Sequence, residues 1–203
     1  MNYPVLPSQF KGSSHDIVSM HCANTLKKAR NNYEILKHRL QAVNKWHTFS
    51  EKIRAEFFLV NPNTFLETTS FSTGNLVKID IPGPPSPSGK GYDWTEITEI
   101  QEDENDDNYQ FYAFTLRPCA NPKTKSDTIS HFYNAEATNT FVIRRLGNCI
   151  YIEAHGRNQT ENTSDVPLLD QVRNKAIAVG SKLGLGSLNW LGFTSALLEP
   201  LKL

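Results

Sequence analysis

The apolar positions near the start of the chain repeat with a helical period. Between His15 and Phe49, apolar residues recur at intervals of three and four with lysine, arginine and asparagine between them. This pattern predicts one amphipathic helix, about 50 Å long at 1.5 Å per residue, capped at Ser13 or Ser14. Its apolar seam comprises Cys22, Leu26, Ala29, Tyr33, Leu36, Leu40 and Val43. Residues 1–14 are expected to form a flexible arm in front of it.

The seam of this helix has two interpretations. The first is that the helix lies along a sheet and supplies part of the core. The alternative is a helix pair across a homodimer interface, for which two or three heptads are few.

The pattern changes to alternation in the middle of the chain. Residues 53–59, 76–81, 94–100 and 109–116 are rich in β-branched and aromatic side chains, and each segment predicts a strand. The last two are separated by the acidic segment 102–108, which predicts an antiparallel hairpin. Residues 82–91 hold four prolines and three glycines, so we expect an exposed loop there.

A second hairpin can be predicted residue by residue. Gly147 and Asn148 both tolerate positive φ and stand between two β-rich segments, which predicts a two-residue turn. The pairing then runs Leu146 with Cys149, Arg144 with Tyr151, Ile143 with Ile152, Val142 with Glu153, Phe141 with Ala154 and Thr140 with His155. One face of this pair is apolar and the other is polar, with Arg144 placed diagonally across from Glu153.

Two helices are predicted at the C-terminal end. Residues 164–167, Ser-Asp-Val-Pro, have the chemistry of a helix start, and a second, shorter helix opens at Ser187. The apolar stripe of the first comprises Leu168, Leu169, Val172, Ala176, Val179 and Leu183, followed by Gly184 and Gly186.

Strands bracketed by helices predict an α+β fold. We expect a single domain over residues 1–203, with an antiparallel sheet of five to seven strands. The long N-terminal helix and the two C-terminal helices would pack on one face of this sheet. The same element order occurs in helix-grip and cystatin-like folds, which hold small ligands between sheet and helix, although no sequence motif accompanies the similarity.

Composition narrows the class of protein. The 203 residues carry no net charge and the pI is near 7.0, which argues against nucleic acid as a partner. No apolar segment approaches the roughly 20 residues of a membrane span, and we expect no signal peptide from the composition of residues 1–12. Cys22, Cys119 and Cys149 lie far apart, so we expect free, buried thiols and a cytoplasmic location.

Three clusters could carry chemistry, although no phosphate-binding, nucleophile or metal motif is present. We therefore expect no cofactor and no metal. The clusters are His155 and Arg157 with Glu153 at a strand end, Arg117 with His131 across a loop, and the triplet Tyr92, Asp93 and Trp94. Arginine and histidine together suit an anionic group.

These residues support three hypotheses. The first is a non-catalytic module that binds a small, possibly anionic, ligand or a protein partner in a cleft over the open sheet face. The second is an enzyme on an anionic substrate, with His155 as general acid or base, Arg117 and Arg157 stabilising charge, and Glu153 or Asp93 orienting the histidine. The third is a structural homodimer.

Overall fold

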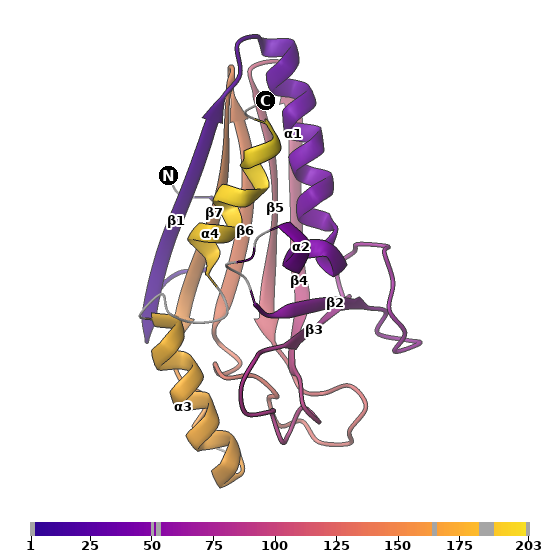
Figure 1. Cartoon of the computed structure of the whole chain (residues 1–203), viewed down its shortest axis with the longest axis vertical. Coiled ribbons are helices and arrows are strands. Elements are labelled where there is room, and N and C mark those ends of the chain that lie inside the picture. Colours follow the sequence, from indigo (N-terminus) through magenta and orange to yellow (C-terminus); the bar gives the residue numbers. More distant parts are fainter. Residues whose placement is uncertain (1–2, 50, 52–53, 164–165, 183–188, 202–203) are drawn as a thin grey trace.

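The computed structural model describes residues 3–49, 51, 54–163, 166–182 and 189–201, and contains one seven-stranded antiparallel sheet with helices (Figure 1). The strands are β1 (Ser13–Cys22), β2 (Glu56–Val60), β3 (Leu76–Asp80), β4 (Asp93–Asp106), β5 (Tyr109–Pro118), β6 (Thr138–Leu146) and β7 (Cys149–Gln159). The α-helices are α1 (Leu26–Gln41), α2 (Trp46–Phe49), α3 (Leu168–Lys182) and α4 (Trp190–Leu198). Short 3-10 helices cover Val43–Lys45 and Glu199–Leu201. No helix within these ranges is long and apolar enough to span a membrane.

The strand order is β1-β7-β6-β5-β4-β3-β2, so consecutive strands from β2 to β7 pair as a meander and β1 adds to the far edge. Helices α1, α2 and α4 lie over one face, here called the inner face, on which Phe114, Phe141 and Ile152 are buried. The opposite face, here called the outer face, carries Ala113 and Val142.

The predicted single N-terminal helix is wrong over its first eleven positions, and it is also interrupted after Gln41, where a 3-10 helix and the separate α2 follow. Residues 13–22 form the edge strand β1, whose side chains alternate between half-buried and exposed. Helix α1 begins only after Thr25, whose hydroxyl accepts a hydrogen bond from the Lys28 amide at 3.1 Å. Ile17, Val18 and Met20 suit a strand as well as a helix, and pairing with β7 decides the outcome.

The seam of α1 packs on the sheet, in agreement with the first interpretation. Ala29, Tyr33, Leu36 and Leu40 are all fully buried in the core of this same chain. The seam is therefore occupied and does not face outward for a helix pair. Part of the segment that was expected to be a flexible arm packs on the sheet, since Tyr3 is buried against the outer face.

The predicted hairpin is confirmed at every position. Leu146 pairs with Cys149, and each further pair from Arg144–Tyr151 to Thr140–His155 has the expected partner. Gly147 takes a φ of 56°, as the tight turn requires. The expected diagonal ion pair forms between Arg144 Nε and Glu153 Oε1 at 2.6 Å. The pairing of the strands around the acidic segment is confirmed, because β4 pairs with β5, but β4 continues to Asp106 and the turn covers only residues 107–108.

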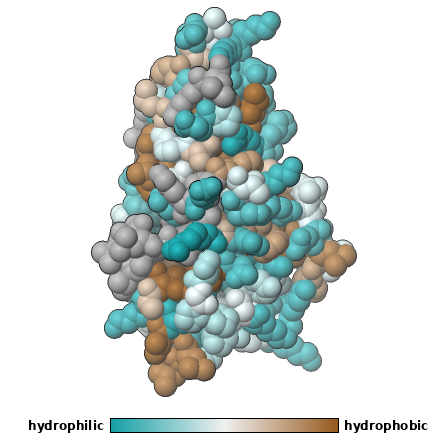
Figure 2. Space-filling view, in the orientation of Figure 1, coloured by the Kyte–Doolittle hydropathy of each residue, from teal (hydrophilic) through white to brown (hydrophobic). Residues whose placement is uncertain are grey.

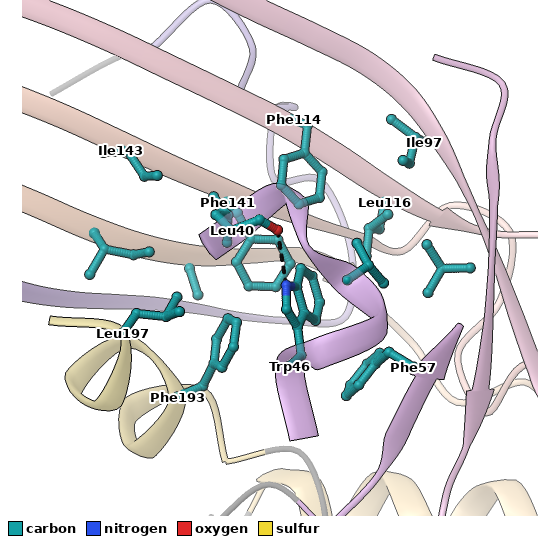
Figure 3. Packing of buried hydrophobic residues seen from close by; sticks show 14 of the residues in the cluster. Leu40, Trp46, Phe57, Ile97, Phe114, Leu116, Phe141, Ile143, Phe193 and Leu197 are labelled. Atoms are coloured by element: carbon teal, nitrogen blue, oxygen red, sulfur yellow. Dashed lines mark hydrogen bonds between the residues drawn. The ribbon is translucent and has the colours of Figure 1, made fainter. Parts of the chain in front are cut away.

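Trp46 is the centre of the core between sheet and helices (Figure 3). Its ring lies about equally far from Phe57, Phe141 and Phe193, with centroid separations of 5.1, 5.2 and 5.0 Å. Its indole N–H donates to the Leu40 carbonyl at 2.9 Å, so the one polar atom of this buried side chain is satisfied.

The two C-terminal helices differ from the prediction in placement. Helix α4 packs on the inner face, where Phe193 and Leu197 are fully buried. Helix α3 lies beyond the end of the sheet, and the first part of its apolar stripe is exposed, with Leu168, Leu169 and Val172 at 72%, 74% and 66%. The end of α3 appears brown at the bottom of Figure 2, so hydrophobic side chains are exposed there. The predicted starts at Ser164–Asp165 and Ser187 lie outside the described residues, as does Leu183.

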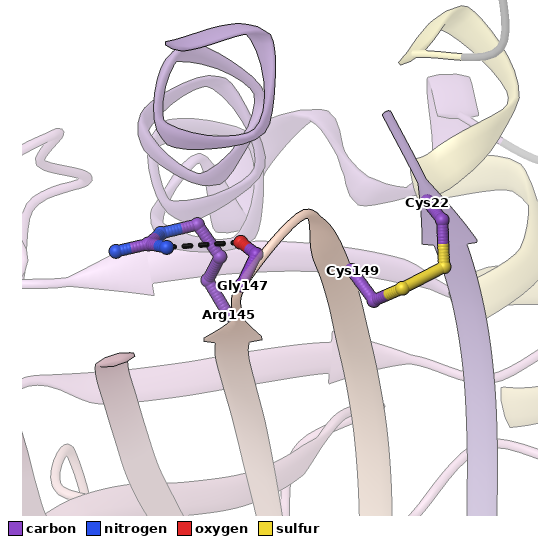
Figure 4. Close-up of a disulfide and its surroundings, with 4 residues drawn as sticks. All are labelled: Cys22, Arg145, Gly147 and Cys149. Carbon is purple, nitrogen blue, oxygen red and sulfur yellow. Dashed lines mark hydrogen bonds between the residues drawn. A yellow bond between two sulfur atoms is a disulfide. The ribbon is translucent and has the colours of Figure 1, made fainter. Parts of the chain in front are cut away.

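The prediction of three free cysteines is wrong. Cys22 and Cys149 are directly opposite each other on β1 and β7 and form a disulfide (Figure 4). Cys119 remains a free, half-buried thiol. The disulfide could not be predicted from the sequence analysis, because Cys22 was assigned to the seam of a helix rather than to a strand. The cysteines therefore no longer support the expected cytoplasmic location, since structural disulfides are typical of oxidising compartments.

Candidate functional site

A cavity of about 640 Å³ lies between the inner face and α4. It is bounded by the first residues of β1, the last residues of β5 and β7, the loop before β6, and the start of α4. Phe57 and Leu116, seen at one edge of the cluster in Figure 3, form part of its wall. Leu191 lines it as well and is 57% exposed, which places the mouth of the cavity beside α4.

The walls are mainly apolar. The apolar lining residues are Ile17, Phe57, Ile79, Leu116, Pro118, Phe132, Tyr133, Ala137, Trp190 and Leu191. Among the described residues that line the cavity there is no lysine, arginine, aspartate or glutamate. A volume of this size with apolar walls and a few polar groups is typical of small-molecule sites.

Several residues that line this cavity carry buried polar atoms without a hydrogen-bond partner within the described ranges. These atoms are the Nε2 of His15, the Oγ1 of Thr95 and of Thr138, and both side-chain amide atoms of Asn139. Thr95 and Thr138 are only 4% and 2% exposed. An unpaired buried polar group costs roughly 1–3 kcal/mol, so these atoms lower the stability of the wall that they belong to.

A glycine on the neighbouring strand positions His15. Gly156 is paired with His15 on one side and with Asn139 on the other, so the three residues form a row across β1, β7 and β6. A Cβ atom on Gly156 would lie 2.3 Å from Cε1 of the His15 ring. The imidazole therefore lies over Gly156, and only glycine leaves room for it. Its Nδ1 is 3.3 Å from Oε1 of Gln159.

Both histidines that line the cavity favour the neutral state. Burial, which outweighs the hydrogen bond with Gln159, lowers the pKa of His15. Burial also lowers the pKa of His131 to about 4. The Nδ1 of His131 accepts a hydrogen bond from the Tyr133 amide at 3.0 Å, which fixes its proton on Nε2. The cavity therefore offers neutral donors and acceptors.

A separate charged cluster lies on the outer face. Glu153 accepts hydrogen bonds from Arg144 at 2.6 Å, from His155 Nε2 at 2.9 Å and from the Tyr3 hydroxyl at 3.1 Å. The other ring nitrogen of His155 is 2.5 Å from Asp16 Oδ1. Both ring nitrogens of His155 are thus engaged with carboxylates, whereas a general base needs one directed at its substrate.

Asp93 and Arg173 form a third polar site, at the N-terminal half of α3. Asp93 is fully buried, and Arg173 donates to its two carboxylate oxygens at 2.5 and 3.2 Å. Arg173 also donates to the Pro84 carbonyl at 2.8 Å. The predicted Pro/Gly loop, residues 82–91, is exposed over most of its length and is held to α3 at this point.

The eight residues predicted for a site lie in different places. His131 lines the cavity. Glu153, His155 and Arg157 belong to the outer face, where Arg157 donates to Asp16 at 2.7 Å. Arg117 is exposed and donates to the Ala135 carbonyl.

The Tyr92–Trp94 triplet is divided as well. Asp93 pairs with Arg173, and the Trp94 indole packs against Val60 and Leu76 in a small core cluster beside Tyr92.

Sequence reasoning missed the residues that line the cavity with unpaired polar atoms. His15 was assigned to a helix, which concealed that it shares a row with Gly156 and Asn139. Thr95 and Asn139 are ordinary strand residues with no local signal. The one available signal was Gly156 in the middle of a β-rich segment, because a glycine there often marks a close approach of another group.

Within the described residues, no three histidine, cysteine, aspartate or glutamate side chains come together as metal ligands. Comparisons with known proteins also leave the family open. No family model matches the chain, and no curated protein matches its sequence.

Several solved structures are similar over most of the chain. Hypothetical protein jhp0584 from Helicobacter pylori is 13% identical with a TM-score of 0.48, covering 94% of this chain and 86% of its own. Ara h 8.0201 is 11% identical with a TM-score of 0.39, covering 94% and 99%. Major latex-like protein 151 from Panax ginseng is 11% identical with a TM-score of 0.37, covering 85% and 96%. All three TM-scores are below 0.5, so these likenesses carry no weight for fold or function.

Proposed function

We propose that this protein binds a predominantly apolar small molecule in the cavity between the inner face and α4. The observation that carries the proposal is the cavity itself, about 640 Å³ with mainly apolar walls and several polar atoms that lack partners among the described residues. Apolar surface of this extent binds through the hydrophobic effect, roughly in proportion to the area that the ligand removes from water.

The predicted anionic ligand has less support than an apolar one. It rested on Arg117 and Arg157, and neither lines the cavity. The enzymatic alternative rested on His155, whose ring nitrogens are both engaged with Asp16 and Glu153 on the outer face. Binding without chemistry is therefore the function that the arrangement favours.

Pyrene is a suitable first probe, because it is a compact hydrocarbon whose emission spectrum reports the polarity around it. We expect pyrene to bind the wild-type protein with an apolar emission signature. Ala137→Leu extends a side chain into the cavity and should weaken this binding by about tenfold, which corresponds to about 1.4 kcal/mol. Val18→Leu is the matched control, since Val18 is 50% exposed on the outer side of β1.

Thermal unfolding verifies that each variant is folded. If Ala137→Leu does not fold, Ile79→Phe fills the same cavity from β3. Absence of pyrene binding to the wild-type protein, or equal binding to wild type and a folded filled variant, contradicts the proposed function.

A further inference from the structure

Helix α3 presents an apolar face to solvent at one end of the molecule, the lower end in Figure 1. Leu168, Leu169, Val172 and Ala176 are all exposed, and their spacing places them on one side of the helix. These four residues are here called the apolar face of α3. Exposed apolar side chains that are contiguous, unlike scattered ones, mark a surface that contacts another molecule.

The opposite side of α3 is held in place by polar contacts. Asp170 accepts a hydrogen bond from the Ser88 amide at 3.2 Å, and Asn174 donates to the Asn162 carbonyl at 2.9 Å. The buried ion pair of Arg173 lies on the same side. Rotating α3 to bury its leucines would break these contacts, so the fold itself directs the apolar face outward.

Exposed lysines accompany this face on α3 and on the two segments beside it, residues 82–91 and 119–130. They are Lys90, Lys123, Lys125 and Lys175. The first segment is hydrogen-bonded to α3 through Ser88, and the second is joined to Asn162, which α3 also contacts. Among the described side chains of α3 and these two segments, Asp127 is the one exposed acid. This end of the molecule therefore combines apolar side chains with an excess of positive charge.

We propose that this end of the molecule docks on the surface of an anionic lipid bilayer. The apolar face of α3 would lie at the boundary between headgroups and acyl chains, with the lysines at the headgroups. An interfacial helix binds through the apolar area that it buries together with electrostatic attraction to anionic lipids, and both are provided here.

The size of the apolar face favours a bilayer over a second copy of the chain. From Leu168 to Ala176 the helix rises about 14 Å, so a stripe about 10 Å wide covers roughly 140 Å². A stable protein interface buries about 800 Å² on each partner, several times this area. The flanking lysines would also repel one another across a symmetric contact.

The cavity lies at the same end of the sheet. Its walls include the first residues of β1 and β6 and the last residues of β5 and β7, and Leu191 lies at its mouth. A docked bilayer would therefore lie close to the cavity that takes an apolar ligand. This reason for a lipid partner rests on the proposed function, whereas the apolar face and the lysines do not depend on it.

Flotation with lipid vesicles tests docking of the full chain without any cavity ligand. We expect the wild-type protein to float with vesicles of phosphatidylcholine that contain about one third phosphatidylserine, and much less with phosphatidylcholine alone. Binding should weaken as the salt concentration rises, because the lysines act through charge.

Leu168→Ser combined with Leu169→Ser tests the apolar face. This variant should bind the phosphatidylserine vesicles at least about tenfold more weakly than wild type. The matched control is Met20→Ser combined with Leu146→Ser, which also removes two exposed apolar side chains, at the opposite end of the sheet. The control should bind within about twofold of wild type, and thermal unfolding verifies that both variants are folded.

Lys123→Gln combined with Lys125→Gln tests the charge. We expect about tenfold weaker binding to the phosphatidylserine vesicles, because two lysines near the bilayer surface are lost. Lys27→Gln combined with Lys28→Gln removes two exposed lysines near the start of α1, at the opposite end of the molecule, and should bind within about twofold of wild type.

Three outcomes would overturn the docking proposal. They are no binding of the folded wild-type protein to phosphatidylserine vesicles, equal binding by the leucine variant and its control, and a dimer in sedimentation that the leucine variant dissociates. The last result would assign the apolar face to a second copy of the chain. Because pyrene binding is measured without vesicles and flotation without pyrene, failure of the proposed function and failure of docking are distinguished.

Discussion

The charge of His155 depends on pH, and both of its ring nitrogens lie within hydrogen-bond distance of carboxylates. Burial disfavours its charged form, but hydrogen bonds to Glu153 and Asp16 outweigh burial and raise the pKa of the imidazole above its ordinary value. Burial likewise disfavours a charged Glu153, but hydrogen bonds from His155 and Arg144 lower its pKa. Each group thus stabilises the charged form of its neighbour, and the cluster joins β1 to β7 beneath Tyr3.

This arrangement predicts a contribution to stability that disappears at alkaline pH. A histidine whose pKa is raised by folding stabilises the protein below its unfolded pKa of about 6.5, and this stabilisation is lost as pH rises through the folded pKa. We therefore expect wild type to exceed His155→Gln in free energy of unfolding at about pH 6, with the difference shrinking towards about pH 9. Urea denaturation at a series of pH values measures this.

The comparison with a variant is necessary because other histidines act in the opposite direction. His15 and His131 have lowered pKa values, so they reduce stability as pH falls through the ordinary histidine range. Because wild type and His155→Gln are compared at the same pH, the contributions of these other histidines cancel in the difference. A His155→Gln difference that stays constant from pH 6 to 9, or grows, contradicts the assigned role.

Among the helices, α3 is unusual because it is attached through its polar side. Asp170, Arg173 and Asn174 are buried, whereas Leu168 and Leu169 are exposed. The buried pair of Arg173 with Asp93 holds the helix to β4, so hydrophobic packing contributes little over the first turns of α3. This reverses the usual relation between an amphipathic pattern and its buried face.

Arg173→Met should therefore destabilise the protein by about 3–5 kcal/mol, because Asp93 would remain buried without its partner. Leu169→Ser should change the free energy of unfolding by no more than about 0.5 kcal/mol, because its side chain is already exposed. Lys175→Met on the exposed side of the same helix controls for the loss of a positive charge. Urea unfolding distinguishes the three variants, and a larger effect of Leu169→Ser than of Arg173→Met would contradict this attachment.

The edge strand β1 depends on a covalent connection as well as on pairing. The Cys22–Cys149 bond joins positions 127 residues apart, so it removes a large loop from the unfolded chain. Replacing both cysteines by serine should lower the free energy of unfolding by about 2–5 kcal/mol. Burial, reinforced by the charge of Glu96, raises the pKa of the remaining Cys119 thiol to about 12.

Thiol counting tests the disulfide independently of stability. Alkylation under denaturing, non-reducing conditions should modify one cysteine, and modification after reduction should reach all three. Cys119→Ser is the matched control, with no reactive thiol expected before reduction. Three reactive thiols in the unreduced wild-type protein would show that the bond does not form.

Viewed as a whole, the molecule places the Glu153 cluster and the polar residues of the cavity on opposite sides of one sheet. The charged groups Arg144, Glu153 and His155 stay on the outer face, where each has a partner. The neutral groups His15 and Asn139 remain on the inner face, within the cavity next to α4. Because the two groups occupy opposite faces, an apolar cavity and a buried network of charges can share the same sheet.

Local patterns were sufficient for much of this architecture. The Gly147–Asn148 turn defined the pairing of β6 with β7 and the faces of their side chains, because a two-residue turn allows one register and alternation does the rest. The α+β class, the antiparallel sheet and the position of α1 from Leu26 onward also followed from periodicity. These features depend on residues that are neighbours in sequence.

The remaining features depend on contacts between residues far apart in the chain. Residues 13–22 became a strand because an edge of β7 was available to pair with them, and that pairing brought Cys22 to Cys149 and His15 to Gly156. The cavity draws residues from both ends of the sequence, and a void has no local sequence signature. Periodicity reports which face of an element is apolar, whereas the site arises where several elements fail to fill the space between them.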